Sequence, residues 1–204
     1  MTMKVSGNMV TCFRKAFETK CITLLISAYN ASIANHNYST DWMENDFTSM
    51  LDEYLEKNPQ RIKWKYSCNI EHHLHKKGLK KERGFANSED RIDMRISTFS
   101  SLDEYLFYVE AKLIKEKSSD LLNRYIRTGI DHYISKKYPQ GIMLGYLLEG
   151  NVDIAINKIN AILIRKNRGN EVLRRKQHLV HNQYFESTHL DFGVISHFVL
   201  DYTL

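Results

Sequence analysis

Three residues in the middle of the chain, Asp93, Glu110 and Lys112, are of the types that hydrolyse phosphodiesters. Carboxylate oxygens bind Mg2+, and the bound cation polarises a phosphate and lowers the pKa of a water molecule. An ammonium group beside them orients that water or offsets the negative charge of the transition state. This chemistry requires the three side chains to meet in space, so it depends on the elements that carry them.

Two stretches around these residues have the period-two alternation of β-strands. In residues 91–96 three apolar residues are predicted to share the face that turns to the core: Ile92, Met94 and Ile96. Asp93 projects from the other face, and in residues 107–113 Glu110 and Lys112 share the polar face. Serine and acidic residues stand between the two stretches, so we predict a β-hairpin with a short turn.

The register of this hairpin places two acids opposite one another. If the turn is centred on the bond after Ser101, the numbers of paired residues sum to 203, and Asp93 pairs with Glu110. Opposed Cβ atoms are about 5 Å apart, where two like charges are destabilising unless a cation holds them. Lys112 lies about 7 Å further along the same face.

Helical spacing of apolar residues predicts two helices before the hairpin. The first covers residues 9–34, in an N-terminal helical extension (1–38) that either covers the sheet or serves a dimer interface. The second covers residues 41–57. Residues 62–70 alternate as a strand, and the polar, basic residues 71–90 follow as a loop or hairpin tip.

The residues after the hairpin predict a crossover between parallel strands. A helix over residues 121–136 precedes residues 142–148, which are nearly all apolar, as in a strand buried on both faces. A strand, a helix and a second buried strand form a parallel, right-handed unit. A further helix over residues 152–166 begins at its N-cap Asn151, and residues 178–204 suggest one or two closing strands.

The order of these elements and the spacing of the acids resemble the PD-(D/E)XK nuclease superfamily, the restriction-endonuclease-like proteins. The motif is carried by Asp93 and, after a gap of 16 residues, by Glu110-Ala111-Lys112 on a strand. Ile92 stands where the name of the motif has proline. The following helix also lacks the Gln-x-x-x-Tyr of the recombination-associated branch, so the branch and its substrate preference stay open.

The resemblance implies an α/β fold with a restriction-endonuclease-like αβββαβ core, in which helices flank a central mixed sheet. The catalytic core would occupy residues 41–148, after the N-terminal helical extension. Residues 151–204 would add a C-terminal helix and the closing strands. The chain has 204 residues, 43% of them apolar, and only two prolines, so we expect a single domain over residues 1–204.

The resemblance also implies roles for residues of the site. Asp93, Glu110 and the Ala111 carbonyl would bind Mg2+ or Mn2+, and Lys112 would activate the attacking water. Members of the superfamily often place an acid on the helix before the sheet, and Glu44 occupies that position. Alternatively, Glu44 belongs to a capping-box-like pattern at the start of the helix and binds only the backbone.

Positive charge is concentrated just before the predicted hairpin. The chain has a formal net charge of +5, and residues 57–87 hold nine Lys or Arg against two acids, which is +7 locally and leaves −2 for the rest. Such a segment is typical of a protein that binds the phosphate backbone, although a solvated loop has the same composition. The candidate DNA-binding residues are Lys63, Lys65, Lys76, Lys77, Lys80, Lys81, Arg91, Arg95, Arg124 and Arg127.

Three other interpretations fit parts of the pattern. The two acids and the lysine could form surface ion pairs with each other and with Arg91 or Arg95, which contribute little to stability. The same scaffold could be a noncatalytic subunit that binds nucleic acid or a partner protein. Zinc binding is the third, although the spacing matches no established pattern. Its ligands would be Cys68, His72, His73 and His75.

The composition also predicts a compartment and partners. Three cysteines without disulfide spacing indicate a reducing environment, and no apolar run approaches the roughly 20 residues of a membrane span. We therefore expect a cytoplasmic protein that acts on DNA and not on a membrane. We expect a role in restriction, phage defence or DNA processing, with activity gated by a partner protein or by formation of a homodimer.

Overall fold

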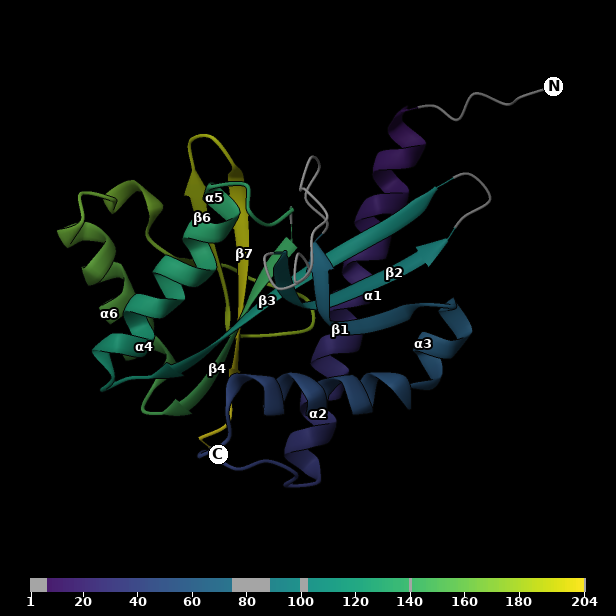
Figure 1. The fold of residues 1–204 in the computed structure, drawn as a ribbon, viewed down its shortest axis with the longest axis horizontal. Coiled ribbons are helices and arrows are strands. Elements are labelled where there is room, and N and C mark those ends of the chain that lie inside the picture. Colours follow the sequence, from purple (N-terminus) through teal and green to yellow (C-terminus); the bar gives the residue numbers. More distant parts are fainter. Residues whose placement is uncertain (1–6, 75–88, 100–102, 140, 204) are drawn as a thin grey trace, which may run out of the picture.

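The computed structural model describes residues 7–74, 89–99, 103–139 and 141–203 (Figure 1). In these residues, N-terminal helices precede a mixed sheet of seven strands, and further helices lie between the strands. The N-terminal helices are α1 (Gly7–Ala34), α2 (Glu44–Glu56) and α3 (Pro59–Trp64). The later helices are α4 (Ser119–Arg124), the π-helix η2 (Tyr125–Ile130), α5 (Asp131–Ile134), α6 (Val152–Arg165) and the 3-10 helix η3 (Gly169–Glu171).

The strands lie in the order β1-β2-β3-β4-β7-β6-β5 across the sheet. Their bounds are β1 (Ser67–Leu74), β2 (Asp90–Phe99), β3 (Glu104–Lys115), β4 (Gly141–Glu149), β5 (Arg174–Arg175), β6 (Tyr184–His189) and β7 (Gly193–Asp201). β4 pairs in parallel with β3 and with β7, and the other neighbours are antiparallel. The predicted parallel crossover and the predicted closing strands are therefore confirmed.

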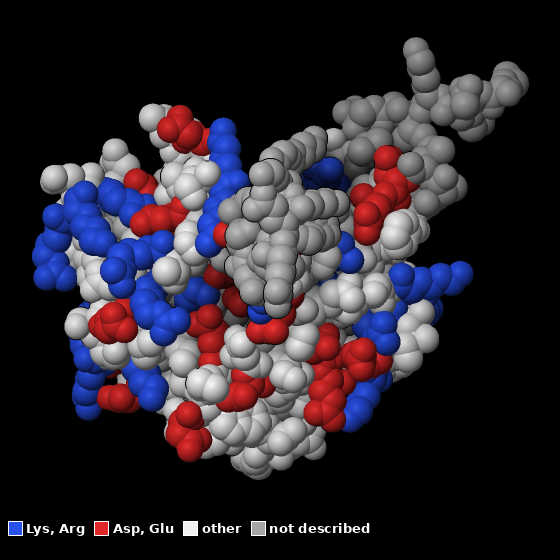
Figure 2. Space-filling view, viewed as in Figure 1, with Lys and Arg blue, Asp and Glu red and all other residues white. Residues whose placement is uncertain are grey.

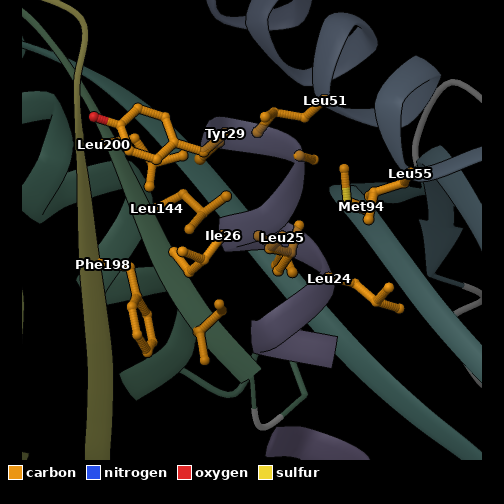
Figure 3. Close-up of a cluster of buried hydrophobic side chains, with 14 of the residues drawn as sticks. Leu24, Leu25, Ile26, Tyr29, Leu51, Leu55, Met94, Leu144, Phe198 and Leu200 are labelled. Carbon is orange, nitrogen blue, oxygen red and sulfur yellow. The ribbon is translucent and has the colours of Figure 1, made fainter. Parts of the chain in front are cut away.

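Two layers of helices bury the two faces of the sheet. α1 and α2 pack on one face, where Leu24, Leu51 and Phe198 meet in one core (Figure 3). The helices from α4 to α6 pack on the other face around Tyr133 and Ile159. Each fully buried side chain of this kind stabilises the fold by about 2 kcal/mol. α1 therefore covers the sheet, which is one of the two roles predicted for it.

α1 has 28 residues and is the longest element at the N-terminus. Charged residues interrupt its sequence from Arg14 to Lys20. Among the described residues, none of the helices combines the length and the apolar composition that crossing a bilayer requires.

The strand predicted over residues 62–70 begins later than expected. α3 occupies its first part, because the Asn58 side chain accepts a hydrogen bond from Gln60 N at 2.9 Å and Pro59 fits the first helical turn. The proline that ends α2 therefore also begins the next helix. β1 then runs from Ser67 to Leu74, into residues that were predicted to form a loop or hairpin tip, and pairs antiparallel with β2.

The β2–β3 hairpin has the predicted register. Met94 pairs with Val109, and the residue numbers of every pair in this ladder sum to 203. The turn residues 100–102 lie outside the described residues. The ladder ends at Met94 and Val109, so it stops one position short of Asp93 and Glu110.

The predicted apolar face of β2 is interrupted at Asp93. Met94 and Ile96 lie in the core under α1, but Ile92 lies in the core on the other side of the sheet. The prediction that all three share one face is therefore wrong. On β1, Glu71 stands opposite Asp93 with a φ of 47°, and the β1–β2 pairing omits this position. The backbone irregularity at this point ends the strict alternation.

The helix that crosses from β3 to β4 contains a π-helical segment. Ser118 caps α4, but the single helix expected over residues 121–136 is divided into α4, η2 and α5. At Gly129 of η2, a Cβ atom would lie 2.3 Å from Met143 Cε and 3.6 Å from Lys112 Cγ. Glycine therefore permits the close approach of this helix to the sheet, and π-helical segments are frequent at functional sites.

A chain of buried polar groups joins η2 to the C-terminal half of the sheet. The Tyr125 hydroxyl lies 2.9 Å from His197 Nδ1, and His197 Nε2 lies 2.8 Å from Ser187 Oγ. Ser187 Oγ lies 2.7 Å from His189 Nε2, and His189 Nδ1 lies 2.7 Å from Glu171 Oε2. Burial, with a smaller effect of His189, lowers the pKa of His197 to about 3, so this imidazole is neutral in the folded protein.

Acidification is expected to destabilise the fold through His197. The pKa of His197 is about 3 in the folded protein and 6.5 ordinarily. As the pH falls below 6.5, the unfolded chain is therefore protonated at this residue before the folded protein is, and the stability of the fold decreases. Between about pH 6.5 and about pH 4 the loss from this one residue is about 3 kcal/mol. Urea unfolding at both pH values should therefore show a smaller loss for His197→Asn than for the wild type.

The matched control for this measurement is His36→Asn, which changes an exposed histidine. This variant should lose as much stability on acidification as the wild type. If His197→Asn also loses the same amount, the buried neutral state of His197 is contradicted.

Candidate functional site

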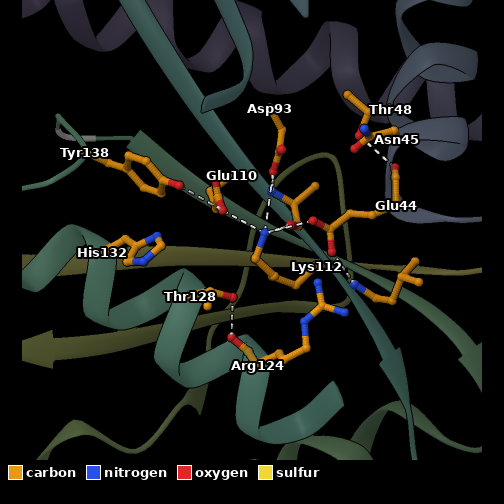
Figure 4. Close-up of polar contacts among 12 residues, drawn as sticks. Glu44, Asn45, Thr48, Asp93, Glu110, Lys112, Arg124, Thr128, His132 and Tyr138 are labelled. Carbon is orange, nitrogen blue, oxygen red and sulfur yellow. Dashed lines mark hydrogen bonds and ion pairs between the residues drawn. The ribbon is translucent and has the colours of Figure 1, made fainter. Parts of the chain in front are cut away.

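Three carboxylates converge on the ammonium group of Lys112 (Figure 4). Lys112 Nζ lies 2.7 Å from Glu110 Oε1, 2.9 Å from Glu44 Oε1 and 3.7 Å from Asp93 Oδ2. The acids come from β3, α2 and β2, so three separate elements meet at one point. Glu110 and Lys112 are buried, while the side chains of Glu44 and Asp93 are 17% and 20% exposed. The ion pair between Asp93 and Lys112 is therefore present, but it is largely buried and not on the surface, and Glu110 pairs with Lys112.

The end of the β2–β3 ladder determines the position of Asp93. Asp93 Oδ2 accepts a hydrogen bond from Ala111 N at 2.6 Å, so this carboxylate satisfies a β3 backbone group where the ladder stops. Alternation along β3 then places Ala111 in the core under α1 and directs Glu110 and Lys112 toward the crossover helix (Figure 4). This alternation of β3 is as predicted.

Glu44 is the first residue of α2, but it does not cap the helix. Asp46 takes that role, because its Oδ2 accepts a hydrogen bond from Met43 N at 2.8 Å. Glu44 Oε1 instead accepts from Lys112 Nζ, and its Oε2 accepts from Leu113 N at 3.3 Å. The capping-box alternative for Glu44 is therefore wrong, and the side chain joins α2 to β3 at the acid cluster.

Glu110 holds a proton more readily than an ordinary carboxyl group. Burial, and then the neighbouring charge of Asp93, raise the pKa of Glu110 to about 8 in spite of the attraction of Lys112. Burial also raises the pKa of Asp93, against the lowering effects of Lys112 and of the Ala111 N–H group. For Lys112, burial lowers the pKa, but the three carboxylates outweigh this effect and raise it. The lysine is therefore charged at neutral pH.

The residues predicted to bind a metal surround the point that this ammonium occupies. Ala111 O lies 2.5 Å from Lys112 Nζ, on which oxygens of Asp93 and Glu110 also converge. Glu110 Oε2 is buried and has no hydrogen-bond partner among the described residues. A carboxylate oxygen without a partner is a ligand that Mg2+ prefers. The oxygens are therefore of the type that binds a divalent cation, but in this structure the Lys112 ammonium lies at the point on which they converge.

A cation at this cluster would be coordinated by few protein ligands. In the described parts of the chain, no group of three or more His, Cys, Asp or Glu side chains is arranged to hold a metal. Two carboxylates and one backbone carbonyl would leave coordination positions for water and substrate oxygens, as is usual for Mg2+. Of the predicted zinc ligands, Cys68, His72 and His73 form no such group, and His75 lies outside the described residues.

The crossover helix and the segment after it contribute residues that sequence reasoning missed. Tyr138 donates its hydroxyl to Glu110 Oε1 at 3.4 Å and is 5% exposed. Figure 4 shows Arg124, Thr128 and His132 on the side of the helix that faces Lys112. Residues four apart lie on one helical face. This row of polar residues is the sequence pattern that would have indicated them.

The arginines of β2, predicted to bind DNA, differ in their surroundings. Arg91 is exposed and pairs with His73 of β1. Arg95 pairs with Tyr108 of β3, and its Nη2 donates to Asn69 Oδ1 at 3.2 Å. Arg95 Nε is buried and has no hydrogen-bond partner within the described residues.

The lysines predicted to bind DNA do not join the acid cluster in the described structure. Lys63 and Lys65 are exposed in and just after α3, which follows the end of α2 that is remote from Glu44 (Figure 1). The 13 residues of α2 separate them from that acid by about 20 Å. Four further candidates lie outside the described residues: Lys76, Lys77, Lys80 and Lys81.

Positive charge gathers on the layer of helices that carries Arg124 and Arg127. Residues 117–176, from the start of α4 to β5, contain 12 Lys or Arg and five Asp or Glu, which gives +7. Figure 2 shows this charge over α4 and α6, whereas acidic side chains lie over α2. Arg127 is exposed and Arg124 is partly buried. The basic residues 165–176 are the only part of this layer that stands out as a patch in the sequence.

Comparison of the chain with protein-family models, with curated proteins and with solved structures finds no match. The class of the protein is therefore given by its own fold and side-chain contacts. It is an α/β protein in which N-terminal helices precede a mixed sheet, with a buried lysine among three carboxylates beside that sheet.

Raising the pH is expected to destabilise the protein through Glu110. The pKa of Glu110 is about 8 in the folded state and 4.5 ordinarily, so the folded protein keeps a proton that the unfolded chain loses. The stability of the fold therefore decreases as the pH rises from 4.5 to about 8. We expect Glu110→Gln to remove about 2 to 4 kcal/mol of this fall. The measurement is urea unfolding in EDTA at about pH 5 and about pH 8.

Glu116→Gln is the control for this variant, because Glu116 pairs with Lys158 at 3.0 Å outside the cluster. It should show the same fall in stability as the wild type. Equal pH dependence in the wild type and in Glu110→Gln would refute the raised pKa.

Proposed function

We propose that the protein is a metal-dependent endonuclease that hydrolyses phosphodiester bonds of DNA, with a restriction-endonuclease-like core. The observation that carries the proposal is the convergence of Asp93, Glu110 and Glu44 on Lys112 at a partly accessible site. The order α2, β1, β2, β3, crossover helix and β4 corresponds to the αβββαβ core of that class and supports the assignment. α3 is an addition to that order.

The residues of the cluster divide the chemistry among them. Asp93, Glu110 and the Ala111 carbonyl would hold Mg2+ or Mn2+, which polarises the phosphate and makes a bound water more acidic. Lys112 orients the attacking water or offsets charge on the phosphate in the transition state. Glu44 accepts from Lys112 Nζ and Leu113 N, and so limits how far the ammonium moves when it leaves the centre of the acids.

The basic layer beside the cluster would bind the DNA backbone. Residues 117–176 carry +7, and Arg124 points from this layer toward Lys112 (Figure 4). Lysine and arginine side chains that neutralise phosphates release counterions, so DNA affinity should fall as salt rises. Arg95, which is partly exposed and pairs with Tyr108, would add a guanidinium for a phosphate on the sheet side of the site.

A nuclease in a cell that contains its own DNA needs control. We therefore propose a cytoplasmic role in restriction, phage defence or DNA processing, in which a regulatory partner protein or dimerisation gates the activity. Cleavage of both strands of a duplex favours two copies of the chain related by a two-fold axis.

A noncatalytic subunit that binds nucleic acid or a partner protein is the second candidate. This candidate is favoured by the position of Lys112. Its ammonium group lies at the point that the proposed metal ligands surround, and it neutralises the acids there. A buried ion-pair cluster of this kind contributes little net stability, because desolvation of the charges offsets their attraction. It also leaves Glu110 Oε2 without a hydrogen-bond partner, so we place this candidate second.

Cleavage of plasmid DNA tests the proposal. We expect cleavage with Mg2+ or Mn2+ and none with EDTA. Asp93→Ala and Lys112→Ala should each lower the rate by about 100-fold or more, because the first removes a metal ligand and the second removes the charge that orients the water or stabilises the transition state. The reaction is followed as nicked and linear DNA on a gel.

The matched control for Lys112→Ala is Lys57→Ala, which removes an exposed lysine that pairs with Glu53 on α2. This variant should cleave at nearly the wild-type rate. If the wild type binds DNA but cleaves it with neither metal, the noncatalytic candidate replaces the nuclease.

A second test measures binding of the metal to the folded protein. A cation at 100 times its Kd adds about 2.7 kcal/mol to the free energy of unfolding, which corresponds to a rise in Tm of about 5 °C or more. We expect this shift with Mn2+ for the wild type and for Glu116→Gln, but not for Asp93→Ala. A wild-type Tm that does not respond to Mn2+ or Mg2+ would rule out the proposed ligands.

A further inference from the structure

A cavity of about 710 Å3 lies beside the acid cluster. Its walls come from β1, β2 and β3, from the residues that follow α5 and from the turn between β6 and β7. Tyr138 lines this cavity and also donates its hydroxyl to Glu110, so the cavity and the cluster share a wall. Tyr108 lines it too, and stands two residues before Glu110 on the same face of β3, about 7 Å along the strand.

Flat side chains form much of the cavity wall. Tyr108, Tyr138 and Phe192 line it together with His72 and His73 of β1. Tyr108 and Phe192 are partly exposed, so a ligand can reach their rings. Proteins hold bases that have left a duplex by stacking them on such rings. The volume is also within the usual range for a small-molecule site.

The charges of the cavity wall cancel. Lys136 and Lys137 are balanced by Asp90 and Asp191, and Lys137 Nζ lies 3.2 Å from Asp90 Oδ1. A phosphate therefore gains little attraction in this cavity, in contrast to the basic layer of residues 117–176. A neutral base finds stacking surfaces and also donors and acceptors for its polar edge.

We propose that this cavity binds one unpaired nucleobase next to the phosphate at the acid cluster, with the base stacked on Tyr108. The inference rests on the proposed function, because it takes the position of the phosphate from the cluster. It deepens that function by naming the substrate class. The preferred DNA has an unpaired nucleotide at the point of attack, as in a single strand, a frayed end or a junction.

Binding measured in EDTA tests this inference separately from catalysis. Labelled oligonucleotides are titrated by fluorescence anisotropy in three forms: a single strand, a duplex with one unpaired nucleotide and a fully paired duplex. The wild type should bind the first two more tightly than the third. Tyr108→Ala should weaken binding of the first two by about 5- to 150-fold, the effect of losing one base–aromatic stack, and leave the paired duplex unchanged.

Two variants separate loss of stacking from loss of structure. Tyr108→Phe keeps the ring and should keep the preference for unpaired DNA. Tyr105→Ala removes another tyrosine of β3, whose ring packs 4.6 Å from that of Phe13 and not on the cavity, and should also keep it. An abasic site in place of the unpaired nucleotide should weaken binding to the wild type but cause no further loss in Tyr108→Ala.

Equal wild-type affinity for paired and unpaired DNA would overturn the inference, even if the protein cleaves DNA. Indifference of the wild type to the abasic site would also overturn it. A preference that Tyr108→Ala abolishes would support the cavity as a base-binding site, even if neither metal gives cleavage and the nuclease proposal fails.

Discussion

The ammonium group of Lys112 joins parts of the structure that are far apart in the sequence. It attracts carboxylates from α2, β2 and β3, which would repel one another in its absence. Because charges are costly to bury, such a cluster adds little net stability, and burial, followed by the charge of Asp93, raises the pKa of Glu110 in spite of Lys112. The chemistry proposed for these residues would account for the cluster better than stability does.

The two faces of the sheet are covered by helices of different character. α1 and α2 cover one face with apolar side chains, and Glu44 at the start of α2 reaches the site. The helices on the other face carry the positive charge. One of them, the crossover helix, turns its polar side toward Lys112. β3 connects the two, because its alternation sends Ala111 to one core and Glu110 to the other side.

Local patterns were sufficient for most elements and for the hairpin register, because the position of the turn fixes which residues pair. They failed where one residue has two effects, as at Pro59, which ends one helix and begins another. They also failed at Asp93, where an irregularity in β1 changes the side of Ile92. Contacts such as that of Tyr138 with Glu110 depend on how the crossover helix is placed, which no local pattern encodes.

The polar chain from Tyr125 to Glu171 has a direction. The Glu171 carboxylate only accepts, so His189 Nδ1 donates to it and Nε2 of the neutral ring accepts from Ser187. Ser187 then accepts from His197, which accepts in turn from the Tyr125 hydroxyl. Every hydrogen is thus committed to one neighbour. One extra proton on either imidazole would make the neighbouring hydroxyl an acceptor and leave that hydroxyl hydrogen without its acceptor in this chain. The anchoring of the crossover helix to β6 and β7 therefore depends on the tautomers of two histidines.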